Sequence, residues 1–303
     1  MYSYYDQNTV LYLNGEYLKA AEAKTDLYGQ SLHYGYAVFE GIRAYKTIKG
    51  EVKIFKAQEH FDRFKRSCEL IHMPYPFNND ELIAACYKVL ELNKMEEAYI
   101  RPLAFCPPNM TLKAALETEI LICAWDWAAY LGEKQLRVMT SSYQRPNPKA
   151  FAIESKTSGL YVNSILASQE AKEKGYDEAL LLDINGYVAE GPGANVFFEK
   201  DGKIITPPTG NILPGITRAT VIELCHELNI PLEEKLSTIE ELRAADSAFF
   251  CGTAAELIGW ESLDGQPFTK PWADSLGKYL QKAYKARVLE AEFKEVYKPA
   301  EVV

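Results

Sequence analysis

The alternation of apolar and polar residues predicts short paired strands and two helices in the first part of the chain. Val10–Leu13 and Glu16–Leu18 flank Asn14-Gly15, a pair typical of a two-residue hairpin turn. Apolar residues at helical spacing, beginning with Phe61 and Phe64, indicate amphipathic helices. The pattern predicts strands at 36–47, 52–55, 98–105 and 119–125, and helices at 58–72 and 80–92, the second capped by Asp80.

The strand pattern stops near residue 126, where we place a boundary between two domains. We expect a small N-terminal α+β domain at 1–126, a linker at 127–134 and a larger C-terminal α+β domain at 135–303. The second domain should contain a strand at 136–142, helices at 162–174, 217–229 and 272–290, hairpins turning at Asn185-Gly186 and Asp201-Gly202, and a strand ending in a tight turn within SAFFCGTAAEL. Hairpins mixed with helices favour an α+β fold with largely antiparallel sheets over a doubly wound parallel sheet.

Composition and charge narrow the function classes. Hydrophobic residues make up 48% of the chain, enough for a packed core, and the formal net charge is −9. An acidic protein repels a phosphate backbone, so we expect no nucleic-acid partner, although local Arg and Lys residues can still bind a small anion. Six cysteines without a C-x-x-C pair, the absence of a signal-peptide pattern and the absence of a membrane-length apolar run together predict a cytoplasmic protein without membrane contact.

Two loops in the second half have the character of anion sites. Leu213-Pro214-Gly215-Ile216-Thr217-Arg218 leads into a predicted helix, whose free N–H groups and dipole favour a negative charge. Cys251-Gly252-Thr253-Ala254-Ala255 is a second turn of small residues. Either loop alone is more often an ordinary turn or helix cap, so the pair only modestly favours phosphate binding.

Strand alternation gathers a second set of candidates. Within FEGIR, it places Phe39, Gly41 and Arg43 on one face of a strand, with room at the glycine for something to approach. Tyr99 and Arg101 share a face in the same way, and a guanidinium beside a hydroxyl suits carboxylate recognition. By itself, a surface arginine packing its stem over an aromatic ring explains this pattern better than a binding site does.

Residue chemistry alone does not select a catalytic group. Lys156 lies among small residues, but a solvated surface lysine is the default for any one position. Glu190, just before Gly191-Pro192-Gly193, is either a turn residue or a carboxylate facing a ring nitrogen. The four scattered histidines form no zinc motif, so we expect no metal, and the sequence contains no P-loop, G-x-G-x-x-G or G-x-S-x-G pattern.

Eight segments in order resemble the fold-type IV aminotransferases, and most closely their branched-chain aminotransferases. The resemblance runs from about Tyr12 to about Phe268, through LHYGYAVFEGIRAY, EHFDRF, AYIRPL, WAAYLG, KTSGLYVNSILASQEA, DINGYVAEGPGANVF, LPGITR and GTAAE. It implies a two-domain α+β fold of the D-amino-acid aminotransferase type, pyridoxal 5′-phosphate as cofactor, and a homodimer or higher homo-oligomer.

The resemblance also implies roles toward the cofactor. Lys156 looks like the lysine that bonds covalently to the cofactor and moves the proton at the substrate Cα. Glu190 resembles the carboxylate that keeps the pyridine nitrogen protonated, and Tyr161 the donor to the 3′ oxygen. The phosphate would be bound by Arg63, Leu213, Gly215, Ile216, Thr217 and Thr253.

Roles toward the substrate follow from the same resemblance. The apolar and aromatic wall around a branched side chain would include Tyr34, Phe39, Trp127 and Tyr130. Gly41 and Arg43 are further candidate substrate-binding residues. Tyr99 and the backbone of Thr253, Ala254 and Ala255 would bind the α-carboxylate. Arg101, with Tyr34 and Tyr130, would bind the second carboxylate of glutamate or 2-oxoglutarate, which keeps that charge out of apolar surroundings.

The resemblance therefore predicts reversible amino transfer between Leu, Ile or Val and 2-oxoglutarate. Two relatives of the same fold are alternatives: a D-amino-acid aminotransferase, which Tyr99-Ile100-Arg101 disfavours, and an aminodeoxychorismate lyase, which would release pyruvate without an amino acceptor. A non-enzymatic binder of small anions is the alternative from another class, and the presence of both Lys156 and Glu190 argues against it.

Overall fold

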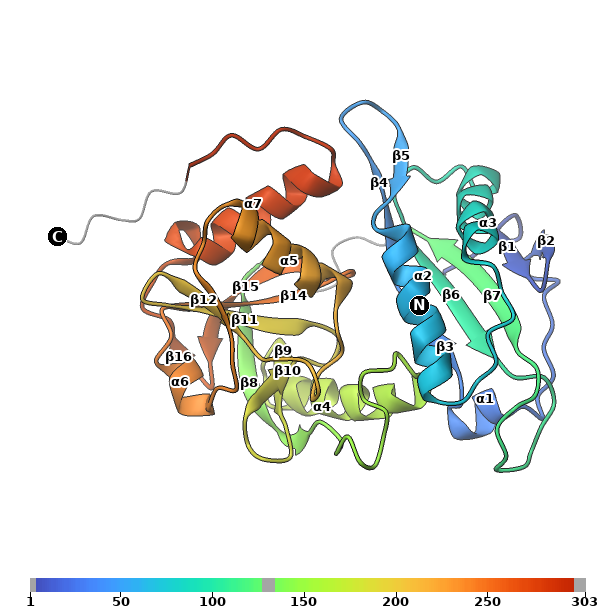
Figure 1. Ribbon diagram of the computed structural model, residues 1–303, viewed down its shortest axis with the longest axis horizontal. Coiled ribbons are helices and arrows are strands. Elements are labelled where there is room, and N and C mark those ends of the chain that lie inside the picture. The colour runs from blue at the N-terminus through green and yellow to red at the C-terminus, as the bar shows by residue number, and fades with distance from the viewer. Residues whose placement is uncertain (1–3, 127–133, 297–303) are drawn as a thin grey trace. The chain divides into compact units, whose positions relative to one another are not determined.

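The computed structural model describes residues 4–126 and 134–296, and its chain divides into two compact units (Figure 1). Unit 1 comprises Met1–Ala128 together with Ser155–Leu160, and unit 2 comprises Ala129–Glu154 together with Tyr161–Val303. The predicted linker at 127–134 lies almost entirely outside the described residues, so that boundary stays a prediction. Within the described ranges, no helix is long and apolar enough to cross a membrane.

Unit 1 is built on a seven-stranded sheet, counted over the described residues, with two long helices packed on it. The strands run in the order β2-β1-β7-β6-β4-β5, and β3 also pairs with β6. Phe61, Phe64 and Val89 from the helices pack against Ile100 and Ile122 of the sheet. The elements are β1 (Val10–Leu13), β2 (Glu16–Lys19), α1 (Gln30–Tyr34), β3 (Val38–Phe39), β4 (Ile42–Lys46), β5 (Val52–Ile54), α2 (Ala57–Leu70), α3 (Asn79–Leu92), β6 (Ala98–Phe105) and β7 (Glu119–Trp125).

Two local predictions in unit 1 were wrong. The strand expected at 36–47 is broken between β3 and β4, because the side chain of Glu40 turns inward to His60 and Arg63 of α2. Helix α3 is capped by Asn78, whose side chain accepts hydrogen bonds from the N–H groups of Asp80 and Glu81. Asn at an N-cap satisfies the same free donors as Asp, so spacing alone did not separate the two positions.

Unit 2 is built on a nine-stranded sheet, again counted over the described residues, in the order β10-β9-β8-β15-β14-β11-β12-β13, with β16 beside β15. Most neighbours are antiparallel; β8 runs parallel to β9 and β15, and β12 runs parallel to β13. The elements are β8 (Leu136–Gln144), α4 (Tyr161–Glu173), β9 (Glu178–Leu182), β10 (Val188–Glu190), β11 (Asn195–Lys200), β12 (Lys203–Thr206), α5 (Ile216–Glu227), β13 (Leu232–Glu234), α6 (Ile239–Arg243), β14 (Ser247–Gly252), β15 (Glu256–Leu263), β16 (Gln266–Pro267) and α7 (Leu276–Val288). The α+β class is confirmed.

The segment that carries Lys156 belongs to unit 1, although the sequence placed it in the C-terminal domain. Its backbone pairs with the strand of Phe39: the Phe39 N–H donates to the Lys156 carbonyl at 3.1 Å, and the Ser158 N–H donates to the Ala37 carbonyl at 2.8 Å. The Lys156 N–H donates to the Ser67 hydroxyl of α2 at 3.0 Å. These bonds fix the backbone of Lys156 from two elements of the same unit.

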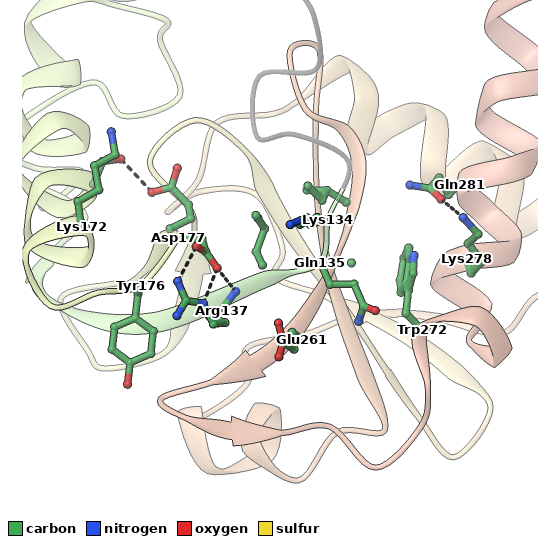
Figure 2. Close-up of a pocket in the computed structure, with 15 residues that line it drawn as sticks. Lys134, Gln135, Arg137, Lys172, Tyr176, Asp177, Glu261, Trp272, Lys278 and Gln281 are labelled. Atoms are coloured by element: carbon green, nitrogen blue, oxygen red, sulfur yellow. Dashed lines mark hydrogen bonds and ion pairs between the residues drawn. The ribbon is translucent and has the colours of Figure 1, made fainter.

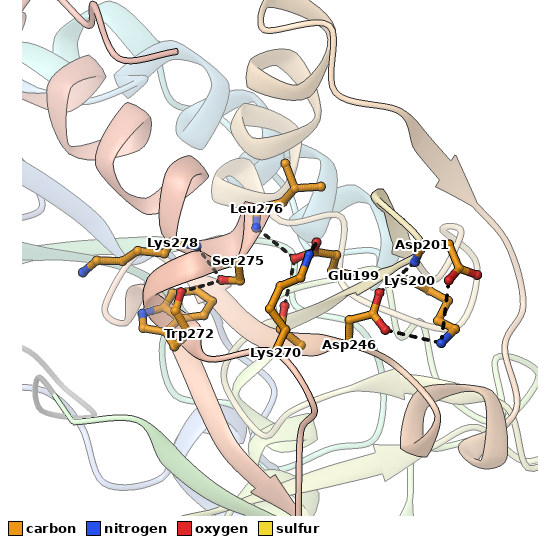
Figure 3. Close-up of polar contacts among 10 residues, drawn as sticks. Glu199, Lys200, Asp201, Asp246, Lys270, Trp272, Ser275, Leu276 and Lys278 are labelled. Atoms are coloured by element: carbon orange, nitrogen blue, oxygen red, sulfur yellow. Dashed lines mark hydrogen bonds and ion pairs between the residues drawn. The ribbon is translucent and has the colours of Figure 1, made fainter. Parts of the chain in front are cut away.

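A buried carboxylate fixes the start of α7 in unit 2 (Figure 3). Glu199 of β11 is fully buried and accepts hydrogen bonds from the Leu276 N–H at 2.9 Å and the Ser247 hydroxyl at 3.1 Å. Its other oxygen pairs with the ammonium of Lys270. The negative charge thus meets the N-terminal end of the helix dipole and a counter-ion together.

We expect Glu199→Gln to lower the free energy of unfolding by about 2–3 kcal/mol, because it leaves Lys270 without its buried counter-ion and weakens the bond to Leu276 N–H. Urea unfolding followed by circular dichroism measures the change. Glu233→Gln is the matched control: its pair with Lys203, at 2.9 Å, is largely exposed and should cost under about 1 kcal/mol. Equal losses in the two variants would contradict the assigned role of Glu199.

Candidate active site

Lys156 lies in an environment that suits a nucleophilic amine. Its Nζ is 4.9 Å from the centre of the Phe39 ring. Burial, and then the positive charge of Arg63, lower the pKa of Lys156 to about 8, against the opposing influence of Glu40. Because an amine must lose its proton before it can attack a carbonyl, a pKa of about 8 gives a usable neutral fraction near neutral pH.

Arg63, whose charge acts on this lysine, is held in place by a buried carboxylate. Its Nε and Nη2 donate to the two oxygens of Glu40 at 2.8 and 2.9 Å, and the Nδ1 of His60 lies 2.8 Å from Glu40 Oε2. Burial opposes ionisation of Glu40, but the Arg63 charge and the His60 hydrogen bond hold its pKa well below the usual value. The sequence analysis missed Glu40 and His60. Glu40 lies in a predicted strand and His60 in a predicted helix, so both fitted the secondary-structure pattern and gave no sign of a role in the site.

The predicted pairing of Tyr99 with Arg101 on β6 is present, with Arg101 Nη2 donating to the Tyr99 hydroxyl at 3.2 Å. The space at Gly41 is used by the same tyrosine: a Cβ built on Gly41 would lie 1.9 Å from the Tyr99 hydroxyl oxygen. Gly41 therefore admits the Tyr99 side chain and leaves no open gap on the strand.

The other predicted substrate residues are more scattered. Arg43 of β4 lies over the ring of Tyr45, with its Cζ 5.7 Å from the ring centre. Tyr34 ends α1, is half exposed, and its hydroxyl donates to the Met110 carbonyl at 3.4 Å. Trp127 and Tyr130 lie outside the described residues.

In unit 2, Glu190 is a buried carboxylate that contacts Arg145, Asn195 and Leu213. Its Oε1 lies 2.9 Å from Nε of Arg145, which is also buried. The side-chain amide of Asn195 donates to Oε2 at 3.0 Å, and the Leu213 N–H donates to both oxygens at 3.2 Å. Arg145 and Asn195 were not predicted, because no local motif around them signals a contact with Glu190. The contact to Leu213 connects the carboxylate to the predicted anion loop.

That loop has the geometry of an anion site. Gly215 is the N-cap of α5 and has no side chain to cap the helix, so the first N–H groups, at Ile216 and the buried Thr217, receive no side-chain cap. A Cβ on Gly215 would lie 2.0 Å from Asn195 Oδ1, so a larger residue does not fit. Free amides at the start of a helix fit a phosphate group.

Thr253, Ala254 and Ala255 form the turn between β14 and β15. The turn joins two antiparallel strands and opens no helix, so an anion here would meet backbone amides without a helix dipole. Tyr161 is the first residue of α4.

Unit 2 also contains a cavity of about 1340 Å³ on another part of its surface (Figure 2). Charged and uncharged side chains share its wall, and Arg137 pairs with Asp177 there at 2.8 Å. The predicted site residues that the structure describes are absent from its lining, so we assign this cavity no part in the candidate site.

Comparison with known proteins decides the family. The family described as amino-transferase class IV matches residues 37–263, a span that includes both Lys156 and Glu190. The chain belongs to the class IV aminotransferases. The branched-chain-amino-acid aminotransferase of Pseudomonas aeruginosa is 41% identical over 285 residues, which cover 92% of each chain.

Solved structures of branched-chain aminotransferases are similar to this chain in fold over nearly its whole length. The branched-chain aminotransferase from Thermoproteus uzoniensis with norvaline has a TM-score of 0.90 and 36% identity, covering 94% of this chain and 96% of that one. The branched-chain amino acid aminotransferase from Thermobaculum terrenum in its PLP form has a TM-score of 0.88 and 34% identity, covering 95% and 96%. The predicted fold type is confirmed.

Proposed function

We propose that this aminotransferase transfers amino groups reversibly between Leu, Ile or Val and 2-oxoglutarate, with pyridoxal 5′-phosphate as cofactor. The observation that carries the proposal is the near full-length similarity to branched-chain aminotransferases, one of them solved in its PLP form. The environment of Lys156 supports it, because a lysine with a pKa of about 8 suits covalent attachment of an aldehyde.

The residues present fit the cofactor. When bound, pyridoxal 5′-phosphate supplies an electron sink for the bond broken at the substrate Cα. Lys156 would hold it covalently and carry the proton to and from Cα. Glu190 would face the pyridine nitrogen, and Tyr161 would donate to the 3′ oxygen. Arg63, Thr253 and the amides of Ile216 and Thr217 would bind the phosphate, with Leu213 and Gly215 shaping that loop.

The substrate would be recognised by groups with two kinds of chemistry. Phe39, with Tyr34, Trp127 and Tyr130, would form the apolar and aromatic wall for a branched side chain, and Gly41 and Arg43 would be further residues of the substrate site. Tyr99 and the backbone of Thr253–Ala255 would bind the α-carboxylate. Arg101 would bind the second carboxylate of glutamate or 2-oxoglutarate, as its bidentate donors allow.

We also propose a homodimer or larger homo-oligomer, and a cytoplasmic location. All six cysteines are unpaired thiols, as expected of a protein kept in a reducing compartment.

Mixing the purified holoenzyme with L-leucine and 2-oxoglutarate tests the proposal. We expect glutamate and 4-methyl-2-oxopentanoate in equal amounts, and loss of the visible absorbance band of the bound cofactor when leucine is added alone. D-leucine should be inert. Exchange with D-leucine instead would favour the D-amino-acid alternative, and a colourless protein that binds no added cofactor would overturn the proposal.

The pKa of Lys156 predicts how cofactor capture depends on pH. Only the neutral amine attacks the aldehyde, so the rate at which apoenzyme binds cofactor should rise with pH up to about 8 and level off above it. With an unperturbed lysine, whose pKa is 10.5, the rate would keep rising to that higher pH. Stopped-flow absorbance between pH 6 and 10 (an interval of about four units around this pKa) distinguishes the two profiles.

A further inference from the structure

The guanidinium of Arg101 is surrounded by three aromatic rings of unit 1. Its Cζ lies 4.5 Å from the centre of the Phe39 ring, 5.2 Å from that of Tyr99 and 5.5 Å from that of Trp125. A guanidinium is attracted to the faces of aromatic rings, and its N–H groups project in its own plane beyond them. The rings therefore hold the charged group while its donors stay available for an acceptor.

We call Phe39, Tyr99 and Trp125 the aromatic cage of Arg101, and strand pairing places Trp125 in it. β6 and β7 are antiparallel, and Trp125 is the Cα partner of Tyr99, so their side chains share a sheet face with Arg101 two residues along β6. The Tyr99 and Trp125 ring centres are 5.1 Å apart with the planes 42° from parallel. Tyr4 meets Trp125 edge-on, with ring centres 5.5 Å apart. Trp125 is thereby held between two aromatic residues.

Arg101 has rings around it but no carboxylate beside it. Among the described residues, no Asp or Glu oxygen lies within ion-pair distance of its guanidinium, which donates a hydrogen bond to the neutral Tyr99 hydroxyl. Its Nε is buried without a hydrogen-bond partner within that same part of the chain. A buried guanidinium donor with no partner is costly unless a ligand satisfies it, and a carboxylate is the anion that matches the fork of donors.

We propose that Trp125 is a positioning residue for dicarboxylate substrates: its ring holds the Arg101 guanidinium against Phe39 and Tyr99, with the donors directed at the second carboxylate of glutamate or 2-oxoglutarate. This inference rests on the proposed function. Phe39 lies beside both Arg101 and Lys156, which connects the cage to the nucleophile. Loss of the Trp125 ring lets the guanidinium move and weakens the binding of dicarboxylates. The binding of branched monocarboxylates, which need no second positive charge, changes much less.

Equilibrium binding to the holoenzyme tests this without turnover. The probes are glutarate, a dicarboxylate without a reactive carbonyl, and 4-methylpentanoate, its branched monocarboxylate counterpart, both measured by isothermal titration calorimetry. Trp125→Leu should raise the Kd of glutarate about 10-fold, the size expected for loss of one desolvated cation–π contact. The Kd of 4-methylpentanoate should change less than about threefold, and Trp125→Phe, which keeps a ring, should lie close to wild type.

Steady-state kinetics should show the same selectivity, with KM for 2-oxoglutarate raised by a larger factor than KM for leucine in Trp125→Leu. Leu121→Ala, on the same face of β7, is the matched control and should not separate the two ligands. Trp125→Met replaces Trp125→Leu if the latter does not fold.

The outcomes separate the inference from the proposed function. If the wild-type enzyme does not transfer amino groups between leucine and 2-oxoglutarate, the proposed function is wrong. An active wild type whose Trp125→Leu variant binds glutarate within twofold, or loses both ligands equally, overturns the role of Trp125 alone.

Discussion

Lys156→Ala is expected to abolish amino transfer, with kcat/KM for leucine falling by more than about 10³-fold. Among the described residues, Lys156 is the only lysine whose ammonium group lies over the Phe39 ring. Burial, together with the charge of Arg63, lowers its pKa to about 8. Alanine at this position removes both the covalent attachment of the cofactor and the group that moves the proton at Cα. No neighbouring residue named in the site carries a second amine.

Absorbance spectra and single-turnover kinetics measure this loss together. The variant should lack the visible band of covalently held cofactor, while its thermal unfolding stays close to that of wild-type apoenzyme. Lys46→Ala is the control, because Lys46 is exposed in the same unit and pairs with Glu96 on the surface. If Lys156→Ala kept the band and a tenth of the activity, another residue would have to be the nucleophile.

Most of the fold could be predicted from the sequence, because its elements are short, have clear apolar and polar periodicity, and are separated by typical turn residues. Strands β6 and β7 occupy the predicted ranges, and the hairpin turn at Asn14-Gly15 has the positive φ angles expected of that pair. The elements missed, such as α1 and α6, are helices of five residues, too short to show a helical period.

The site was readable only in part, because its chemistry depends on contacts between residues far apart in the sequence. Residue patterns could not choose Lys156 among the lysines; the family resemblance selected it, and its surroundings supply the physical reason. Glu40 sits in a strand motif where alternation assigns it a face, yet its side chain leaves the strand to bind Arg63. Arg145 pairs with Glu190 across two strands, which no local signal predicts. Long-range pairs of buried charges follow from tertiary structure, not from spacing.

Glu190→Gln is expected to lower kcat by about 10²–10³-fold while the variant still binds cofactor, a loss in the range of removing one fixed electrostatic group from an active site. The carboxylate is buried and receives hydrogen bonds from Asn195 and Leu213 as well as the charge of Arg145, so it is held in one position. On the proposed function it keeps a proton on the cofactor nitrogen, and a neutral amide cannot. The half-reaction with leucine, followed by stopped-flow absorbance, isolates this step from the second substrate.

Stability has to be separated from chemistry in this variant, because Gln leaves Arg145 buried without its counter-ion. Glu178→Gln is the matched control: Glu178 is a buried carboxylate on the neighbouring strand β9, and its oxygen accepts from the Ser168 hydroxyl at 2.9 Å. Glu190→Asp, which keeps the charge but shortens its reach, should be intermediate in rate. A Glu190→Gln enzyme within threefold of wild type, or a Glu178→Gln enzyme equally impaired, would remove Glu190 from the chemistry and leave it as a structural partner of Arg145.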